Sequence, residues 1–150
     1  LHTNDAPSTI TRLQNMGTPD YLISAATQLV VAQRLARKNC KNCKIPDDDV
    51  NPKVLQDLGF SAEQASRVKA IKGKGCETCS NTGYKGRQGI YEILVVSKPL
   101  KEAILRKATT PELRQIAVKE GFQTMQDMGK RLIASGDLNF REYERVLSGD

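Results

Sequence analysis

Apolar residues in the last third of the chain recur every three or four positions, the spacing that gathers them on one face of an α-helix. From residue 98 onward this spacing predicts four successive helices, with apolar positions Leu100, Ile104 and Leu105, then Leu113, Ile116 and Ala117, then Met125, Met128, Leu132 and Ile133, and finally Tyr143, Val146 and Leu147. Gly121 and Gly136 are expected to end two of these helices. We expect the apolar faces to form a core.

The first forty residues combine two short helices with one β-like run. The first helix is predicted from three apolar positions at helical spacing, Ile10, Leu13 and Met16. Pro19 at a first helical position predicts a second helix that continues to about Ala26. Residues 28–37 are compatible with a helix or a strand, and we favour a strand because Val30 and Val31 are β-branched.

The middle of the chain is predicted to contain shorter elements. Residues 53–59 and 61–68 predict two short helices, and Ser61 is suited to cap the second. Residues 90–96 are apolar and β-branched, and they predict a strand that is preceded by Gly89. Taken together, these patterns predict an α+β protein that is mostly helical.

Composition and charge bound the class of protein. The chain has 150 residues, of which 39% are hydrophobic and 5% aromatic, so its core must consist of aliphatic side chains. The formal charge of +6 permits an anionic partner, but the basic residues are spread along the chain as on an ordinary solvated surface. No apolar run approaches the roughly 20 residues that cross a bilayer, so we expect no transmembrane segment. The start at Leu1, without Met or a leader, leads us to expect a piece of a longer protein.

All four cysteines lie in two Cys-x-x-Cys pairs, Cys40 with Cys43 and Cys76 with Cys79. A two-residue spacer lets two thiolates reach one tetrahedral ion, and a second pair completes its coordination. Four protein sulfurs close such a site, which is then structural rather than catalytic, and Zn²⁺ is the expected ion. Two disulfides are a rival interpretation that requires an oxidising compartment, and iron–sulfur or redox dithiol chemistry is another.

Residues near the cysteines support the zinc interpretation. Three glycines occur where a tight chelating turn needs unusual backbone angles, namely Gly73, Gly75 and Gly83. Four lysines can offset the charge of a four-thiolate site, namely Lys38, Lys41, Lys44 and Lys74.

Four motifs occur in a characteristic order along the chain. They are Leu1-His2-Thr3-Asn4-Asp5-Ala6, then Val31-Ala32-Gln33-Arg34-Leu35, then the first cysteine pair, and then the second pair followed by Thr82-Gly83-Tyr84-Lys85-Gly86-Arg87-Gln88-Gly89-Ile90-Tyr91-Glu92. Together they resemble the type II secretion and type IV pilus extension ATPases. The specific motifs extend to about residue 96, and the rest of the chain resembles the family only as a helical tail.

The resemblance implies a division of the chain into four parts. Residues 1–39 would be the C-terminal remnant of a RecA-like ATPase domain, and residues 40–80 a tetracysteine zinc-binding subdomain with a helical insert. Residues 81–97 would return as a strand to the ATPase core, and residues 98–150 would form a C-terminal helical subdomain or bundle.

The resemblance also implies a role at a nucleotide. His2 would sense or position the terminal phosphate, and Arg12 and Arg87 would lie near the nucleotide. From the residues alone, an isolated histidine more often caps a helix or packs against its neighbours. Imidazole and guanidinium groups both stabilise charge in phosphoryl transfer. The sequence contains no Gly-x-x-x-x-Gly-Lys-Ser/Thr phosphate loop and no upstream acidic boxes for Mg²⁺, so we expect ATP hydrolysis only in a longer parent protein.

In that family, the parent would be a cytoplasmic homohexamer that associates peripherally with the inner membrane through a platform protein. It would power type IV pilus assembly or type II secretion, and the sequence does not decide between the two. A zinc-knuckle nucleic-acid or chaperone-like module is the alternative. We favour no nucleic-acid partner, because the Cys-x-x-Cys-x-x-x-Gly motif occurs once and exposed aromatic residues are few.

Overall fold

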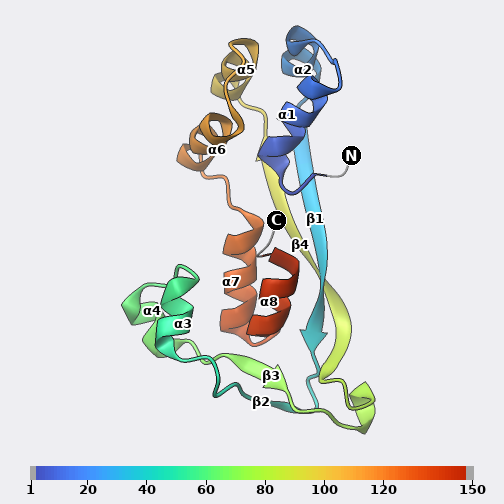
Figure 1. Cartoon of the computed structure of the whole chain (residues 1–150), viewed down its shortest axis with the longest axis vertical. Helices are drawn as coiled ribbons and strands as arrows, with labels where there is room; N and C mark the ends of the chain where they lie inside the picture. The colour runs from blue at the N-terminus through green and yellow to red at the C-terminus, as the bar shows by residue number, and fades with distance from the viewer. Residues whose placement is uncertain (1–2, 148–150) are drawn as a thin grey trace. The chain divides into compact units, whose positions relative to one another are not determined.

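The structure is a computed structural model that describes residues 3–147. Within that range it contains eight α-helices, a short 3-10 helix and four strands (Figure 1), which confirms the α+β class. The chain divides into two compact units, each built from two stretches of sequence. Unit 1 comprises Leu1–Gln33 and Tyr91–Met125, and unit 2 comprises Arg34–Ile90 and Gln126–Asp150. Among the described helices, none has the length and apolar character needed to span a bilayer.

Two long strands carry the chain between the units. Strand β1 (Leu29–Asn39) pairs with strand β4 (Tyr84–Val95) in a two-stranded sheet. The strand favoured for residues 28–37 is therefore confirmed. Strand β4 starts earlier than residue 90, because pairing with β1 extends it through Gly86, which adopts φ +82°. Sequence patterns alone placed this glycine-rich stretch before the strand.

Unit 1 packs four helices against its part of this sheet. These helices are α1 (Ala6–Asn15), α2 (Asp20–Ala26), α5 (Lys98–Leu105) and α6 (Thr110–Lys119). Helix α1 begins where the Asp5 carboxylate accepts a 2.8 Å hydrogen bond from the Ser8 N–H, which satisfies one free donor of the first turn. Their shared core consists of aliphatic side chains, among them Ile10, Ile23, Leu94, Leu100, Ile104 and Leu113. As the composition predicted, no aromatic residue is among the fully buried members of this described cluster.

A buried carboxylate ties three segments of unit 1 together. Glu92 on β4 is only 2% exposed. One of its oxygens accepts the N–H of Ala6 at the start of α1, and the other accepts the N–H of Met125 at 2.9 Å. Burial raises the pKa of Glu92, while the two N–H donors act in the opposite direction. Glu92 therefore holds the first residues of two helices.

Unit 2 contains a small hairpin that the sequence patterns did not reveal. Strands β2 (Lys44–Pro46) and β3 (Ile71–Gly73) are antiparallel, with Ile45 opposite Lys72. Three residues are too few to display a period of two, so sequence patterns miss such strands. Helices α3 (Pro52–Asp57) and α4 (Ala62–Arg67) lie between them and confirm the two predicted helices, and Ser61 forms a capping box with Gln64.

The remaining helices of unit 2 approach each other closely. Helix α7 (Met125–Ser135) meets α8 (Phe140–Leu147) at Gly129, where an added Cβ would lie 2.5 Å from Leu147 Cδ1. All four helices predicted after residue 98 are present. Because α5 and α6 belong to unit 1, while α8 and all of α7 after Met125 belong to unit 2, a single C-terminal bundle stays a prediction.

A buried ion pair links α8 to β1 inside unit 2. The Glu142 side chain is fully buried and accepts hydrogen bonds from the Arg37 backbone N–H at 2.6 Å and from the Arg145 guanidinium at 2.7 Å. The Arg37 guanidinium donates to Glu142 at 3.0 Å and stacks 4.0 Å above the Tyr84 ring. Burial acts to raise the pKa of Glu142, but the hydrogen bonds from Arg145 and Arg37 outweigh it and lower this pKa to about 2.

Candidate metal centre

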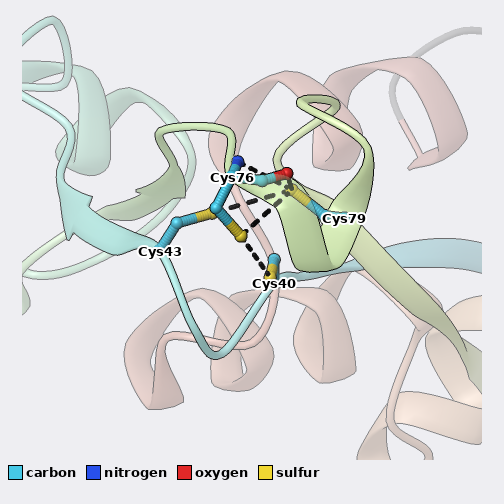
Figure 2. A group of neighbouring side chains, drawn as sticks. All are labelled: Cys40, Cys43, Cys76 and Cys79. Atoms are coloured by element: carbon cyan, nitrogen blue, oxygen red, sulfur yellow. Dashed lines mark hydrogen bonds between the residues drawn. The ribbon is translucent and has the colours of Figure 1, made fainter.

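Two turns of unit 2 bring the four cysteines together. Cys40 and Cys43 lie between β1 and β2. Cys76 precedes the 3-10 helix η1 (Glu77–Cys79), which ends at Cys79 and lies between β3 and β4. Figure 2 shows the four sulfurs converging on one point, and all of them lie within 4.8 Å of one another. The sequence prediction that the two pairs meet is therefore correct.

Three of the sulfur–sulfur distances match the edges of a tetrahedral metal site. The Sγ–Sγ distances are 3.7 Å for Cys40–Cys76, 3.7 Å for Cys76–Cys79 and 3.8 Å for Cys43–Cys79. A tetrahedron of sulfurs around Zn²⁺, with Zn–S bonds of about 2.3 Å, has edges of about 3.8 Å. The donor set and its spacing therefore fit a zinc ion held by Cys40, Cys43, Cys76 and Cys79.

The cysteines are free thiols rather than disulfides. A disulfide needs a sulfur–sulfur distance of about 2.05 Å, well below the distances found here. Cys40 and Cys79 are buried and the other two are half-buried, so the group is mostly shielded from solvent. Four thiols around one point leave no open position for a substrate, which suits a structural role.

The backbone of the two turns depends on glycine. Gly75 and Gly83 adopt φ +105° and +82°, which confirms that both need unusual backbone angles. Gly73 does not have a positive φ, but an added Cβ would lie 2.0 Å from the Gly83 carbonyl oxygen. This glycine is needed for close approach of two backbones. The Cys40 N–H also donates to the Gly83 carbonyl at 2.9 Å, so the two turns are bonded directly.

Hydrogen bonds to the sulfurs make the four thiols unequal. The side chain of Asn42 donates to Cys76 Sγ at 3.4 Å, and it is the largest influence that lowers the pKa of Cys76, to about 6. The Gly75 N–H acts to lower the pKa of Cys43, but burial and hydrogen bonds to the other three thiols outweigh it and raise this pKa to about 11. Four close thiols cannot all ionise easily without a cation, so metal binding must displace protons.

The structure does not test the residues predicted to contact a nucleotide. His2 lies outside the described residues. Arg12 belongs to α1 of unit 1 and borders an open polar hollow of about 260 Å³. The other residues that line this hollow are Thr3, Asn4, Ser8, Thr11, Asn15 and Thr110. Arg87 is exposed on the part of β4 that belongs to unit 2, so the nucleotide roles of these residues stay predictions.

The structure also identifies a residue that sequence reasoning missed. Asn42 is an ordinary spacer residue in the first Cys-x-x-Cys pair, and no motif or period distinguishes it. Only the folded arrangement, which brings its amide to a sulfur of the second pair, makes it part of the site.

Comparison with known proteins places the chain in a family. Residues 1–145 match the family described as Type II/IV secretion system protein. A type IV pilus assembly ATPase PilB of Myxococcus xanthus is 37% identical over 142 residues, which cover 95% of this chain and 25% of the relative. The PilB of Thermus thermophilus is 42% identical over 129 residues, covering 86% of this chain and 14% of the relative.

A secretion protein is also similar. The type II secretion system protein HxcR of Pseudomonas aeruginosa is 34% identical over 146 residues, which cover 97% of this chain and 27% of the relative. The chain thus spans about a quarter of the length of most of these relatives. Since the family match extends over nearly the whole chain, this protein belongs to the Type II/IV secretion system protein family.

Proposed function

We propose that the chain is the C-terminal part of a cytoplasmic, hexameric ATPase that powers type IV pilus assembly or type II secretion. The names of its relatives support this role, since they include pilus assembly ATPases and type II secretion proteins. The coverage of about a quarter of the relatives supports a position within a longer parent.

The observation that carries the proposal is an exposed apolar face on the sheet of unit 1. Three outward residues of β4 are Tyr91, Ile93 and Val95, and two of β1 are Leu29 and Val31; all are exposed, with Ile93 at 54%. They alternate with buried neighbours such as Val30 and Leu94. Strands that are apolar on both faces are typical of α/β sheets covered on both sides.

A two-stranded sheet is marginal by itself, and here the helices of unit 1 cover only its other face. The apolar outer face therefore supports the assignment of residues 1–39 and 81–97 to the edge of a larger, RecA-like ATPase domain. Residues 40–80 would be the zinc-binding subdomain, and residues 98–150 the C-terminal helical subdomain. In the parent, His2, Arg12 and Arg87 would contact ATP with Mg²⁺.

The remaining parts of the proposal follow from the family resemblance. The parent would associate with the inner membrane through a platform protein of the pilus or secretion machine. The zinc ion would supply no reaction chemistry; it would hold the two turns of unit 2 together. The four cysteines would provide the entire coordination shell.

Substitution of Ile93 by Asp tests whether the outer face is covered in the parent. In the isolated chain, Ile93→Asp should cost only about 1 kcal/mol, because the side chain is already exposed. In the intact parent, a buried carboxylate should cost several kcal/mol and lower the yield of folded protein. Val118→Asp is the control, since Val118 is similarly exposed but lies on helix α6 rather than on a strand. A parent that tolerates Ile93→Asp as well as the isolated chain does would contradict the larger sheet.

ATP hydrolysis tests the activity itself. The purified, zinc-loaded chain should show no turnover above the buffer background, because it contains no phosphate loop. The intact parent should hydrolyse ATP, and Arg12→Ala in the parent should lower turnover without changing the unfolding midpoint. Phosphate release measured at saturating ATP and Mg²⁺ provides the comparison. Turnover by the isolated chain, or none by the parent, would refute the proposal.

A further inference from the structure

The N–H groups that donate to the sulfurs are of two kinds, backbone and side chain. Cys79 Sγ accepts the backbone N–H groups of Cys76 at 3.3 Å and Gly83 at 3.2 Å, and Cys43 Sγ accepts that of Gly75 at 3.3 Å. Cys76 Sγ accepts its N–H bond from a side chain, that of Asn42, at 3.4 Å. The remaining sulfur, that of Cys40, is buried.

The Asn42 bond connects the two cysteine turns. Asn42 belongs to the first pair and donates to a sulfur of the second, while Gly75, beside the second pair, donates to Cys43 of the first. Each turn therefore gives one hydrogen bond to a sulfur of the other. The backbone donors are held by their turns, whereas the Asn42 amide depends on the rotamer of one side chain.

Cys76 is the sulfur whose hydrogen bond is easiest to lose. Cys43 and Cys76 are half-buried, whereas Cys40 and Cys79 are buried, so a competing chelator or an electrophile can reach the first two more easily. Of these two, Cys43 has a backbone donor and Cys76 depends on the Asn42 side chain. An N–H donor withdraws electron density from a thiolate and makes it a weaker nucleophile. Partners of metal ligands also orient the ligands and strengthen metal binding.

We propose that Asn42 is a positioning residue of the metal centre, which holds the Cys76 sulfur toward the bound ion and protects it from attack. The proposal rests on the metal site proposed above. Asn42 acts through Cys76 and does not coordinate the ion. When its amide is lost, the Cys76 sulfur is the first to leave the ion, while the other three sulfurs stay in place.

The test compares three variants of the zinc-loaded chain. Asn42→Leu keeps the size of the side chain and removes the donor, while Asn42→Gln keeps an amide on a longer arm. Thr78→Ala is the matched control, since Thr78 is an exposed, uncharged spacer residue of the second pair. Three readouts are used: zinc transfer to a chelating dye, alkylation of each cysteine by N-ethylmaleimide, located by mass spectrometry, and the sulfur-to-metal charge-transfer band with Co²⁺.

In Asn42→Leu, we expect zinc transfer to be about tenfold faster, as for other losses of a partner to a metal ligand. Cys76 should become the first cysteine alkylated, and the Co²⁺ band should move to longer wavelength because the thiolate is richer in electrons. Asn42→Gln should restore part of each effect, and Thr78→Ala should match the unaltered chain. A general loss of stability would not move the band or single out Cys76.

Two results would overturn the proposal, and they are distinguishable. If the unaltered chain binds Co²⁺ but Asn42→Leu leaves all three readouts unchanged, Asn42 has no such role and the metal site stands. If the unaltered chain binds neither Zn²⁺ nor Co²⁺, both the metal site and the role of Asn42 are wrong.

Discussion

Removal of zinc is expected to unfold residues 40–80 of unit 2. Few apolar side chains are buried in this stretch, chiefly Leu55, Ala65 and Ala70 beside the cysteines themselves. The sheet of this stretch is the hairpin of β2 and β3, with three residues in each strand. Segments of about 40 residues seldom fold without a metal or a disulfide. Apparent zinc binding energies of about 10–16 kcal/mol would replace the missing burial.

Hydrogen exchange with and without a chelator measures this directly. Amides of residues 40–80 should lose protection when zinc is removed, and about one zinc per chain should be released as four thiols become titratable. Cys40→Ser should reproduce the effect, because it removes one of four ligands. Lys41→Ser is its control, since it introduces the same residue at the adjacent exposed position.

Two outcomes would contradict a structural zinc site. One is full amide protection of residues 40–80 in metal-free protein with four free thiols. The other is purified protein that contains no metal and in which all four cysteines are oxidised, which would favour the disulfide interpretation.

Substitution of Glu142 by Gln is expected to destabilise the chain by about 3 kcal/mol at neutral pH. The glutamine would keep the shape of the side chain but lose the charge that two guanidinium groups and one backbone N–H contact. Removal of one partner from a buried ion pair typically costs about 3–5 kcal/mol. We place the effect at the low end because Arg37 and Arg145 are about half exposed and can be hydrated.

The contribution of the Glu142 carboxylate to stability should depend on pH in a definite direction. The folded pKa of Glu142 is about 2, below its ordinary value of 4.5. The contribution of this carboxylate to stability is therefore fully present above about pH 4.5 and is lost as the pH falls towards 2. A shift of this size corresponds to about 3 kcal/mol, at about 1.4 kcal/mol per pKa unit.

Chemical denaturation of both proteins between pH 7 and pH 3 is the measurement. Because acid also releases zinc from thiolates, the difference between the two proteins isolates Glu142. That difference should shrink as the pH falls. Glu63→Gln is the control: Glu63 also pairs with an arginine, at 2.6 Å, but both side chains are over 70% exposed, so the change should stay within about 0.5 kcal/mol. Equal effects of the two substitutions would show that burial of Glu142 does not matter.

Local patterns predicted most of the secondary structure. Every predicted helix is present, because helical spacing and capping residues such as Ser61 act within a few positions. The preference for a strand at residues 28–37 was also correct. The errors lie where distant pairing decides the conformation: β4 begins at Tyr84 because it pairs with β1, and the β2–β3 hairpin joins two distant three-residue segments that show no pattern of their own.

The sequence by itself determined the helices, the family and the four cysteines as one ligand set, since each is written in residue type and short spacing. Only the tertiary structure decided how the set is built. It shows that three pairs of sulfurs lie 3.7–3.8 Å apart, that Asn42 reaches Cys76, and that Gly73 lets two backbones approach closely. It also decided that Glu92 and Glu142 are buried among specific donors. These contacts join residues far apart in the chain, and no local physical signal in the sequence encodes them.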